Sequence, residues 1–364
     1  MMNKIRSFVF ILAVFSCVEP YEFLIEDNQR TIVVEAMISD KSFNETLEYP
    51  SDGRYFTAKL TYSGDVTNER PDPIVGAHVE LISSEGESWV YAETDPGIYT
   101  LLDIDFKARH LVRYKLVVLH LEDLYESSWE ELPSSEVPPM GDVGFVESEK
   151  EVYVVEAGEN VVRTKKGINV FNRLATHGGE AIYYRWRFTP TWIYRAPLAS
   201  SAGPYYTCWA TNINYLRDYK LQIDQTGGYQ KPLFFIETIR NERLFEEFSL
   251  LVTQYAMTEA EFFFWNEMQD QAEGGAINDT PPFDIVTNFE NKDKKRVSGY
   301  FGVSQEQARR WYFNIDDLSY RVDKTLKADC LVDYGPGGPS PGCLDCREYS
   351  HGDATTVRPA WWTQ

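Results

Sequence analysis

Patterns typical of β-strands recur along the first third of this chain at a spacing of about ten residues. In Phe56–Tyr62, apolar and polar residues alternate, as they do in a strand with one buried face. No helical periodicity separates the strand patterns. They predict an immunoglobulin-like or transthyretin-like β-sandwich over residues 31–131. The other segments with this pattern are 31–39, 76–82, 89–93, 98–102 and 113–121.

A stretch rich in Pro and Ser at residues 132–141 predicts a linker, and strand patterns return beyond it. One α-helix is expected over residues 259–272. Thr258 and Glu261 have the spacing of a capping box, and Gly274 and Gly275 follow the helix. The fold class is therefore mainly β, with a second β-rich domain over residues 142–364. Its expected strands are 143–145, 151–156, 167–171, 181–188, 232–237 and 246–255.

The N-terminus has the pattern of an export signal. Lys4 and Arg6 precede a short apolar run, and Ser16 and Cys17 follow the run. The apolar run is too short to span a bilayer, which needs about 20 residues. A cysteine at this point is typical of a lipoprotein signal, so we expect residues 1–16 to be removed and Cys17 to be lipidated. The alternative is an ordinary secretory signal with a chance cysteine. Residues 17–30 would form the tether.

The charge of the chain limits its partners. The formal net charge is −21 among 364 residues. Binding to nucleic acid requires cationic surface that contacts phosphates, so nucleic acid is not expected as a partner. High negative charge favours solubility through self-repulsion. The alternative is calcium binding, but the Asp-x-Asp-x-Asp-Gly pattern of a calcium loop does not occur.

Four cysteines remain after Cys17 in a chain that we expect to be exported, and an even number predicts two disulfides. The sequence leaves their pairing open. A redox pair or a zinc site is the alternative. Two of the cysteines lie far from any other, whereas zinc sites show close pairs. The four are Cys208, Cys330, Cys343 and Cys346.

Sequence motifs for catalysis are lacking. The five histidines have no metal-binding spacing, and the chain has neither a nucleophile elbow nor a phosphate-binding loop. We therefore expect no catalytic residues, no metal and no cofactor. A pair of carboxylates could still act on a glycosidic bond, but a single sequence cannot select the pair.

A segment rich in Tyr and Trp offers candidates for stacking on sugars or peptides. The alternative is that these rings fill the core, since aromatic side chains bury about 150–250 Å² each. The candidate residues are Trp186, Trp192, Tyr194, Tyr205, Tyr206 and Trp209.

Short stretches along nearly the whole chain match one family in their order. They include Cys17–Pro20, Ile32–Ala36, Tyr183–Trp186, Ser249–Tyr255, Gly299–Phe301 and Cys343–Cys346. With these stretches the chain resembles the outer-membrane lipoproteins of unknown function of Bacteroidota, which often occur beside SusC/SusD-type TonB-dependent transporters. The resemblance implies a location and a partner, not a chemistry.

We therefore expect a protein that is lipid-anchored at the outer membrane and exposed at the cell surface. It would serve as an accessory or ligand-binding subunit of a TonB-dependent uptake complex, and a glycan or peptide would be its ligand. The alternatives are a glycan or peptide hydrolase and an assembly or structural factor of the envelope. An acidic or histidine-containing cleft would favour the hydrolase.

Overall fold

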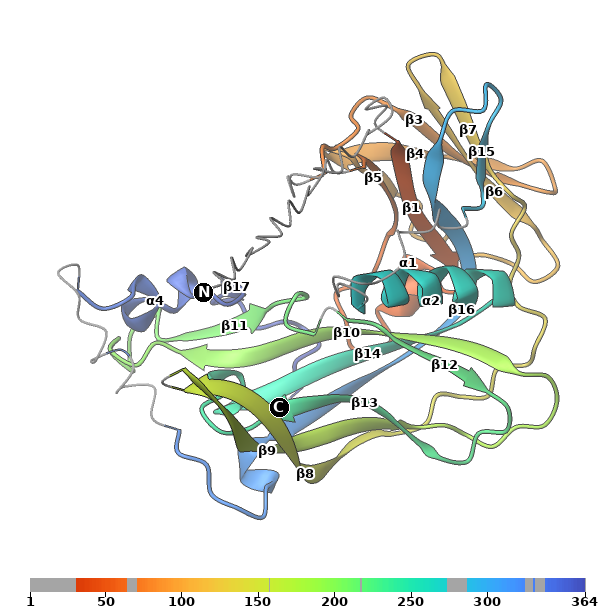
Figure 1. Cartoon of the computed structure of the whole chain (residues 1–364). Coiled ribbons are helices and arrows are strands. Elements are labelled where there is room, and N and C mark those ends of the chain that lie inside the picture. Colours follow the sequence, from red (N-terminus) through yellow and green to blue (C-terminus); the bar gives the residue numbers. More distant parts are fainter. Residues whose placement is uncertain are drawn as a thin grey trace, which may run out of the picture. The chain divides into compact units, whose positions relative to one another are not determined.

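The computed structural model confirms a mainly β protein (Figure 1). It describes residues 31–63, 71–156, 158–216, 218–273, 287–324, 330 and 338–363. The expected signal peptide, the tether and Cys17 lie outside the described residues, so their assignments stay predictions.

The first half of the fold is a β-sandwich, as expected from the alternating strand patterns. Its strands are β1 (Ile32–Ser39), β2 (Phe56–Tyr62), β3 (His78–Ser83), β4 (Ser88–Asp95), β5 (Ile98–Leu101), β6 (Tyr114–His120) and β7 (Asp123–Ser127). A core of apolar side chains lies inside it, with Leu60, Val79 and Leu116 fully buried. The short helix α1 (Phe43–Thr46) follows β1 and is capped by Ser42.

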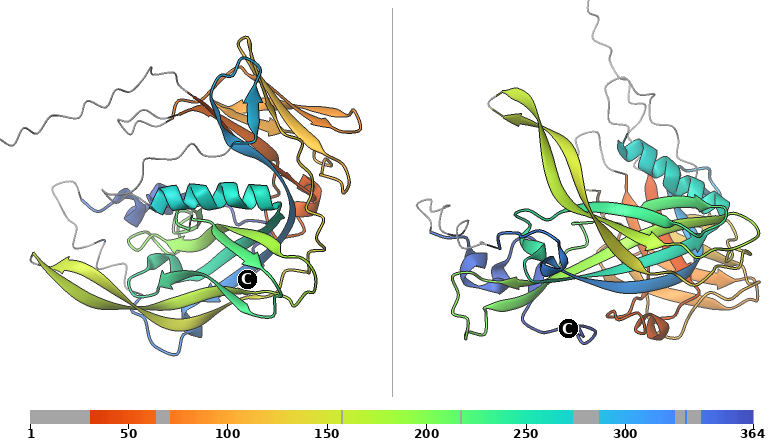
Figure 2. Two further views of the ribbon diagram at one scale, coloured as in Figure 1. Left: turned by 45° about the vertical axis from the view of Figure 1, so that its right-hand side comes forward. Right: turned by 90° about the horizontal axis from the view of Figure 1, so that it is seen from below.

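Seven strands of the second half precede the long helix. They are β8 (Val143–Glu156), β9 (Glu159–Arg173), β10 (Ile182–Arg195), β11 (Thr207–Thr211), β12 (Lys220–Asp224), β13 (Gln230–Glu237) and β14 (Glu247–Met257). The patterns at 143–145 and 151–156 belong to one strand, β8, because the whole of it pairs with β9 as a long hairpin (Figure 2). A 3-10 turn, η1 (Glu242–Leu244), precedes β14.

The C-terminal elements return to both halves. They are β15 (Phe289–Asn291), β16 (Val297–Asn314), η2 (Ile315–Asp317), α4 (Pro341–Leu344), η3 (Cys346–Glu348) and β17 (Asp353–Thr355). β15 pairs with β7, and β17 pairs with β11. The division of the chain into domains at residues 132–141 stays a prediction, and the structure adds that late strands complete the first sandwich.

β16 is the strand that joins the two halves. Its first part runs parallel to β1, from the Ile32–Val297 pair to the Ser39–Ser304 pair. Its second part pairs antiparallel with β14. Gly299 has a φ of +103°, and a Cβ there would lie 2.0 Å from the carbonyl oxygen of Val34. Only glycine therefore allows β16 to approach β1 so closely.

The largest core lies on one face of the sheet formed by β10, β14 and β16. Alternate residues of β10, including Trp186 and Phe188, point into this core, where they meet Ile168 and Ile236 of the three-stranded sheet β13-β9-β8. The opposite face carries the intervening residues, such as Arg187 and Thr189. This second face is polar, and it holds the candidate site.

Helix α2 (Glu259–Glu273) confirms the expected helix and covers one end of the polar face (Figure 1). Thr258 Oγ1 accepts the backbone N–H of Glu261 at 3.3 Å, as in a capping box. The Glu261 side chain turns inward instead of back to the cap. Gly302 of β16 makes this possible, because a Cβ there would lie 2.5 Å from the Glu261 carboxylate.

Candidate functional site

A groove of about 370 Å³ lies on the polar face, between β10, β14 and β16 below and the segment after α1 at one side. Its volume falls at the low end of the range of about 300–1,000 Å³ that is usual for small-molecule sites. Strand alternation creates the floor, because every second residue of each strand faces the groove. The register places Arg187 beside Thr253, and Thr253 beside Ala308.

Threonines supply most of the hydroxyl groups on the floor. Thr191 and Thr211 share a hydrogen bond of 2.9 Å between their hydroxyls. Thr189 and Thr253 also line the groove, and their hydroxyls form no hydrogen bond within the described part of the chain. These two groups are free to donate to a ligand or to accept from one.

Two acidic residues line the groove, and both are engaged by the protein itself. Glu306 is 3% exposed, forms an ion pair with Arg54, and accepts the Ser39 hydroxyl at 2.6 Å. Asp52 accepts the indole N–H of Trp361 at 2.8 Å. Each of these carboxylates thus holds a neighbouring side chain in place.

Burial would lower the pKa of Arg54, but the Glu306 carboxylate outweighs burial and raises it. The Arg54 guanidinium therefore remains protonated over the physiological pH range.

Arg310 is held equally firmly. Its guanidinium lies 3.4 Å from the centre of the Trp361 ring, donates to the carbonyl of Pro50 and donates to Ser249 Oγ at 3.0 Å. Burial lowers the pKa of Arg310 to about 10. The stacked guanidinium thus forms one wall of the groove and fixes the C-terminal Trp361 against the sheet.

Arg187 differs from the other two arginines of the groove. It is exposed, and within the described residues its side chain has neither an ion pair nor a hydrogen bond. An unpaired guanidinium presents its donors in a planar fork that matches a carboxylate. Arg187 is therefore the group of the groove that is best placed to receive an anion.

A buried ion pair lies beside the groove, under α2. Arg185 and Glu261 are 4.0 Å apart and nearly fully buried. The Arg185 guanidinium stacks 3.9 Å from the Trp265 ring, and Glu261 accepts the Ser304 hydroxyl at 3.1 Å. Burial lowers the pKa of Arg185 to about 10 and raises the pKa of Glu261. This pair fixes α2 on the sheet.

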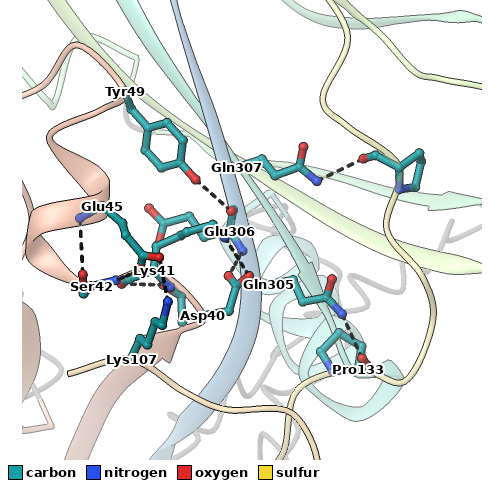
Figure 3. A network of polar contacts seen from close by, with 12 residues as sticks. Asp40, Lys41, Ser42, Glu45, Tyr49, Lys107, Pro133, Gln305, Glu306 and Gln307 are labelled. Atoms are coloured by element: carbon teal, nitrogen blue, oxygen red, sulfur yellow. Dashed lines mark hydrogen bonds and ion pairs between the residues drawn. The ribbon is translucent and has the colours of Figure 1, made fainter. Parts of the chain in front are cut away.

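Polar contacts also hold the segment after β1 and the 132–141 segment against β16 (Figure 3). The Glu306 backbone N–H donates to Asp40 at 2.7 Å, and the Glu306 carbonyl accepts the Tyr49 hydroxyl at 3.1 Å. Gln305 and Gln307 donate to the carbonyls of Pro133 and Pro138, at 2.9 and 3.0 Å. Of these residues Tyr49 and Glu306 line the groove, so these contacts fix the β16 edge of the groove to the segment after α1.

The aromatic residues expected to bind a ligand do not form one surface. Trp186, Trp192 and Tyr194 are buried in the large core. Only Tyr205 is exposed, and its ring stacks 3.6 Å from the Arg347 guanidinium. Tyr206 and Trp209 are half-buried. Trp186, Trp192 and Tyr194 fill the core because these alternate positions of β10 all point to the same face.

The structure contains two disulfides, as expected, and it defines their pairing. Cys208 of β11 is bonded to Cys346 of η3, and Cys330 is bonded to Cys343 of α4. The first disulfide lies in the large core, with both cysteines fully buried. It fixes the C-terminal segment to the sheet that carries the groove.

Sequence reasoning did not find the groove residues Arg54, Arg187, Arg310 and Trp361. A signal was present for one of them, because Arg187 interrupts an aromatic strand with a charge at an alternate position. No sequence signal shows that the segment after α1 meets β16.

Two further features concern metal sites and membrane-spanning helices. Among the residues that the structure describes, no cluster of His, Cys, Asp and Glu could hold a metal ion. No helix in the described ranges is both long enough and apolar enough to cross a bilayer.

The fold and the groove define a mainly β protein with a small polar binding site. The chain belongs to a protein family described as a domain of unknown function, DUF4249, whose model matches residues 18–310. No curated protein and no solved structure matches the chain. The family match covers the strands that form the groove, but not Trp361.

Proposed function

We propose that this protein is a lipid-anchored ligand-binding subunit at the outer membrane that works beside a TonB-dependent transporter. The groove on the polar face of β10, β14 and β16 would receive the ligand. The observation that carries the proposal is the state of the groove's charged groups. Among the residues that the structure describes, Arg187 is unpaired, whereas Glu306 is paired with Arg54 and Asp52 accepts a hydrogen bond from Trp361.

This arrangement favours binding over catalysis. General acid–base catalysis needs a titratable group within hydrogen-bond reach of the substrate and free to exchange a proton. Glu306 and Asp52 are instead committed to Arg54 and Trp361. Hydroxyls and a guanidinium suffice to hold a ligand.

The cellular location is proposed from the sequence. The export pattern that ends at Cys17 supports a lipid anchor, and the family resemblance supports a transporter partner. An anchor keeps the protein in the plane of the membrane, which raises its effective concentration near a membrane partner. A weak contact with the transporter would then suffice for function.

Affinity purification of the tagged protein from outer membranes in mild detergent tests this proposal. A β-barrel transporter should co-purify with the wild-type protein, and much less of it should co-purify with the Cys17→Ser variant. The purified protein should show no turnover of glycan or peptide panels. Recovery of the lipidated protein without any partner would contradict the proposal. So would substrate cleavage that is lost in a folded Glu306→Gln or Asp52→Asn variant.

A further inference from the structure

We infer that the groove binds a small sugar acid, and that Arg187 receives its carboxylate. This inference rests on the proposed function and names the ligand class of the same site. Three properties of the groove support it, taken over the residues that the structure describes: its one unengaged cation, its free hydroxyls and its size.

The first property is the unengaged cation. Three arginines line the groove, but Arg54 is paired with Glu306, and Arg310 is held by Trp361, Ser249 and the Pro50 carbonyl. Arg187 has no such partner within the described residues. A carboxylate can accept two parallel N–H···O bonds from its guanidinium. This geometry selects a carboxylate over a neutral group.

The charge of the whole chain limits how many anionic groups the ligand carries. With a net charge of −21, the protein repels a polyanion over long distances. At physiological ionic strength this repulsion is screened beyond about 8 Å. Within the groove the nearby Arg187 charge therefore dominates, so a small ligand with one or two carboxylates is accepted while a densely charged polymer is not.

The hydroxyls indicate what the rest of the ligand is like. Thr189 and Thr253 lie in the groove next to Arg187, and their hydroxyls have no hydrogen-bond partner in the described part of the chain. Such groups can both donate to and accept from the hydroxyls of a sugar. Leu216 and Leu251 add an apolar side, which suits the C–H face of a sugar ring. The cavity of about 370 Å³ limits the ligand to a small saccharide.

Isothermal titration calorimetry of the full-length protein in mild detergent tests the inference. The probes are digalacturonate, the neutral digalactose and a tripeptide with a free carboxyl terminus. We expect digalacturonate to bind at least about tenfold more tightly than digalactose, a difference of about 1.4 kcal/mol. The tripeptide should bind no better than digalactose. Tighter binding of the tripeptide than of digalacturonate would overturn the assignment to a sugar acid.

Variants of the groove then test the role of Arg187. Arg187→Gln should weaken digalacturonate binding about tenfold or more and leave digalactose binding unchanged. Arg187→Lys should lose less digalacturonate affinity than Arg187→Gln, because lysine keeps the positive charge but lacks the planar fork of donors. The matched control is Arg195→Gln. Arg195 lies on the same strand and is paired with Glu246 at 3.3 Å, outside the groove. The Arg195→Gln variant should bind digalacturonate and digalactose with the affinities of the wild type.

The thermal midpoints of these variants should equal that of the wild type, since both arginines are exposed. Unchanged digalacturonate affinity in a folded Arg187→Gln variant would refute the inference. The proposed function fails in a different experiment, the co-purification with a transporter, so the two failures are distinguishable.

Discussion

Loss of the Cys208–Cys346 disulfide should destabilise the protein more than loss of the Cys330–Cys343 disulfide. The reason is the length of chain that each bridge closes: the sequence separations are 138 and 13 residues. A disulfide restricts the unfolded chain, and in the chain-entropy model the restriction grows with the logarithm of loop length. The model gives about 5 kcal/mol for the longer loop and about 3 kcal/mol for the shorter one.

Packing acts in the same direction. Cys208 and Cys346 are both 0% exposed and lie in the largest core, whereas Cys330 and Cys343 are 8% and 7% exposed. Replacing the buried pair by alanine therefore also removes contacts within a close-packed interior. The difference of about 2 kcal/mol from loop length is thus a lower bound.

The assay compares two double variants, Cys208→Ala/Cys346→Ala and Cys330→Ala/Cys343→Ala, by thermal unfolding followed by circular dichroism. The first should unfold at least about 3 °C below the second, because the unfolding entropy is about 2.1 cal/mol/K per residue over the whole chain. Mass spectrometry without reduction should first show that the wild-type protein has both bridges. Equal midpoints in the two variants, or a lower midpoint in the second, would refute the loop-length reasoning. Four free thiols in the native protein would refute the pairing itself.

Three further predictions concern the ion pairs and the anchor. Glu306→Gln should lower the free energy of unfolding, measured in urea, by about 3 kcal/mol, because it leaves Arg54 without its buried partner. The control Glu35→Gln should cost under about 1 kcal/mol, since both side chains of the Glu35–Lys59 pair are 51% exposed.

Burial raises the pKa of Glu261 above 4.5 in the folded state. As the pH rises, the Glu261 carboxyl therefore loses its proton in the unfolded chain before it does so in the folded protein. Wild-type stability should therefore fall relative to that of Glu261→Gln as the pH rises from 4.5 through the raised pKa, and parallel stability curves would contradict the shift. Cys17→Ser should move the protein to the soluble fraction, and a variant that stays on membranes after a salt wash would exclude the anchor.

The local patterns of the sequence predicted much of the fold. The strand patterns in Phe56–Tyr62 and its neighbours predicted β1 to β6 of the first sandwich, because strand periodicity follows from backbone geometry alone. They did not predict β7, β15 or β16. Thr258 predicted the start of α2, because a helix cap depends only on residues within the first turn. Such signals are local, so one sequence contains them in full. The prediction that Trp186, Trp192 and Tyr194 bind a ligand was wrong, because alternation does not state which face of a strand is buried.

The sequence alone determined that the chain is mainly β, where its helix begins and that its late cysteines form bridges. Only the tertiary structure decided that β16 joins β1 to β14, which cysteines pair, and that Arg187, Arg54 and Arg310 share one groove. These facts depend on contacts between residues that lie far apart in the chain. Their energies come from burial and pairing in three dimensions, which no local pattern of residues records.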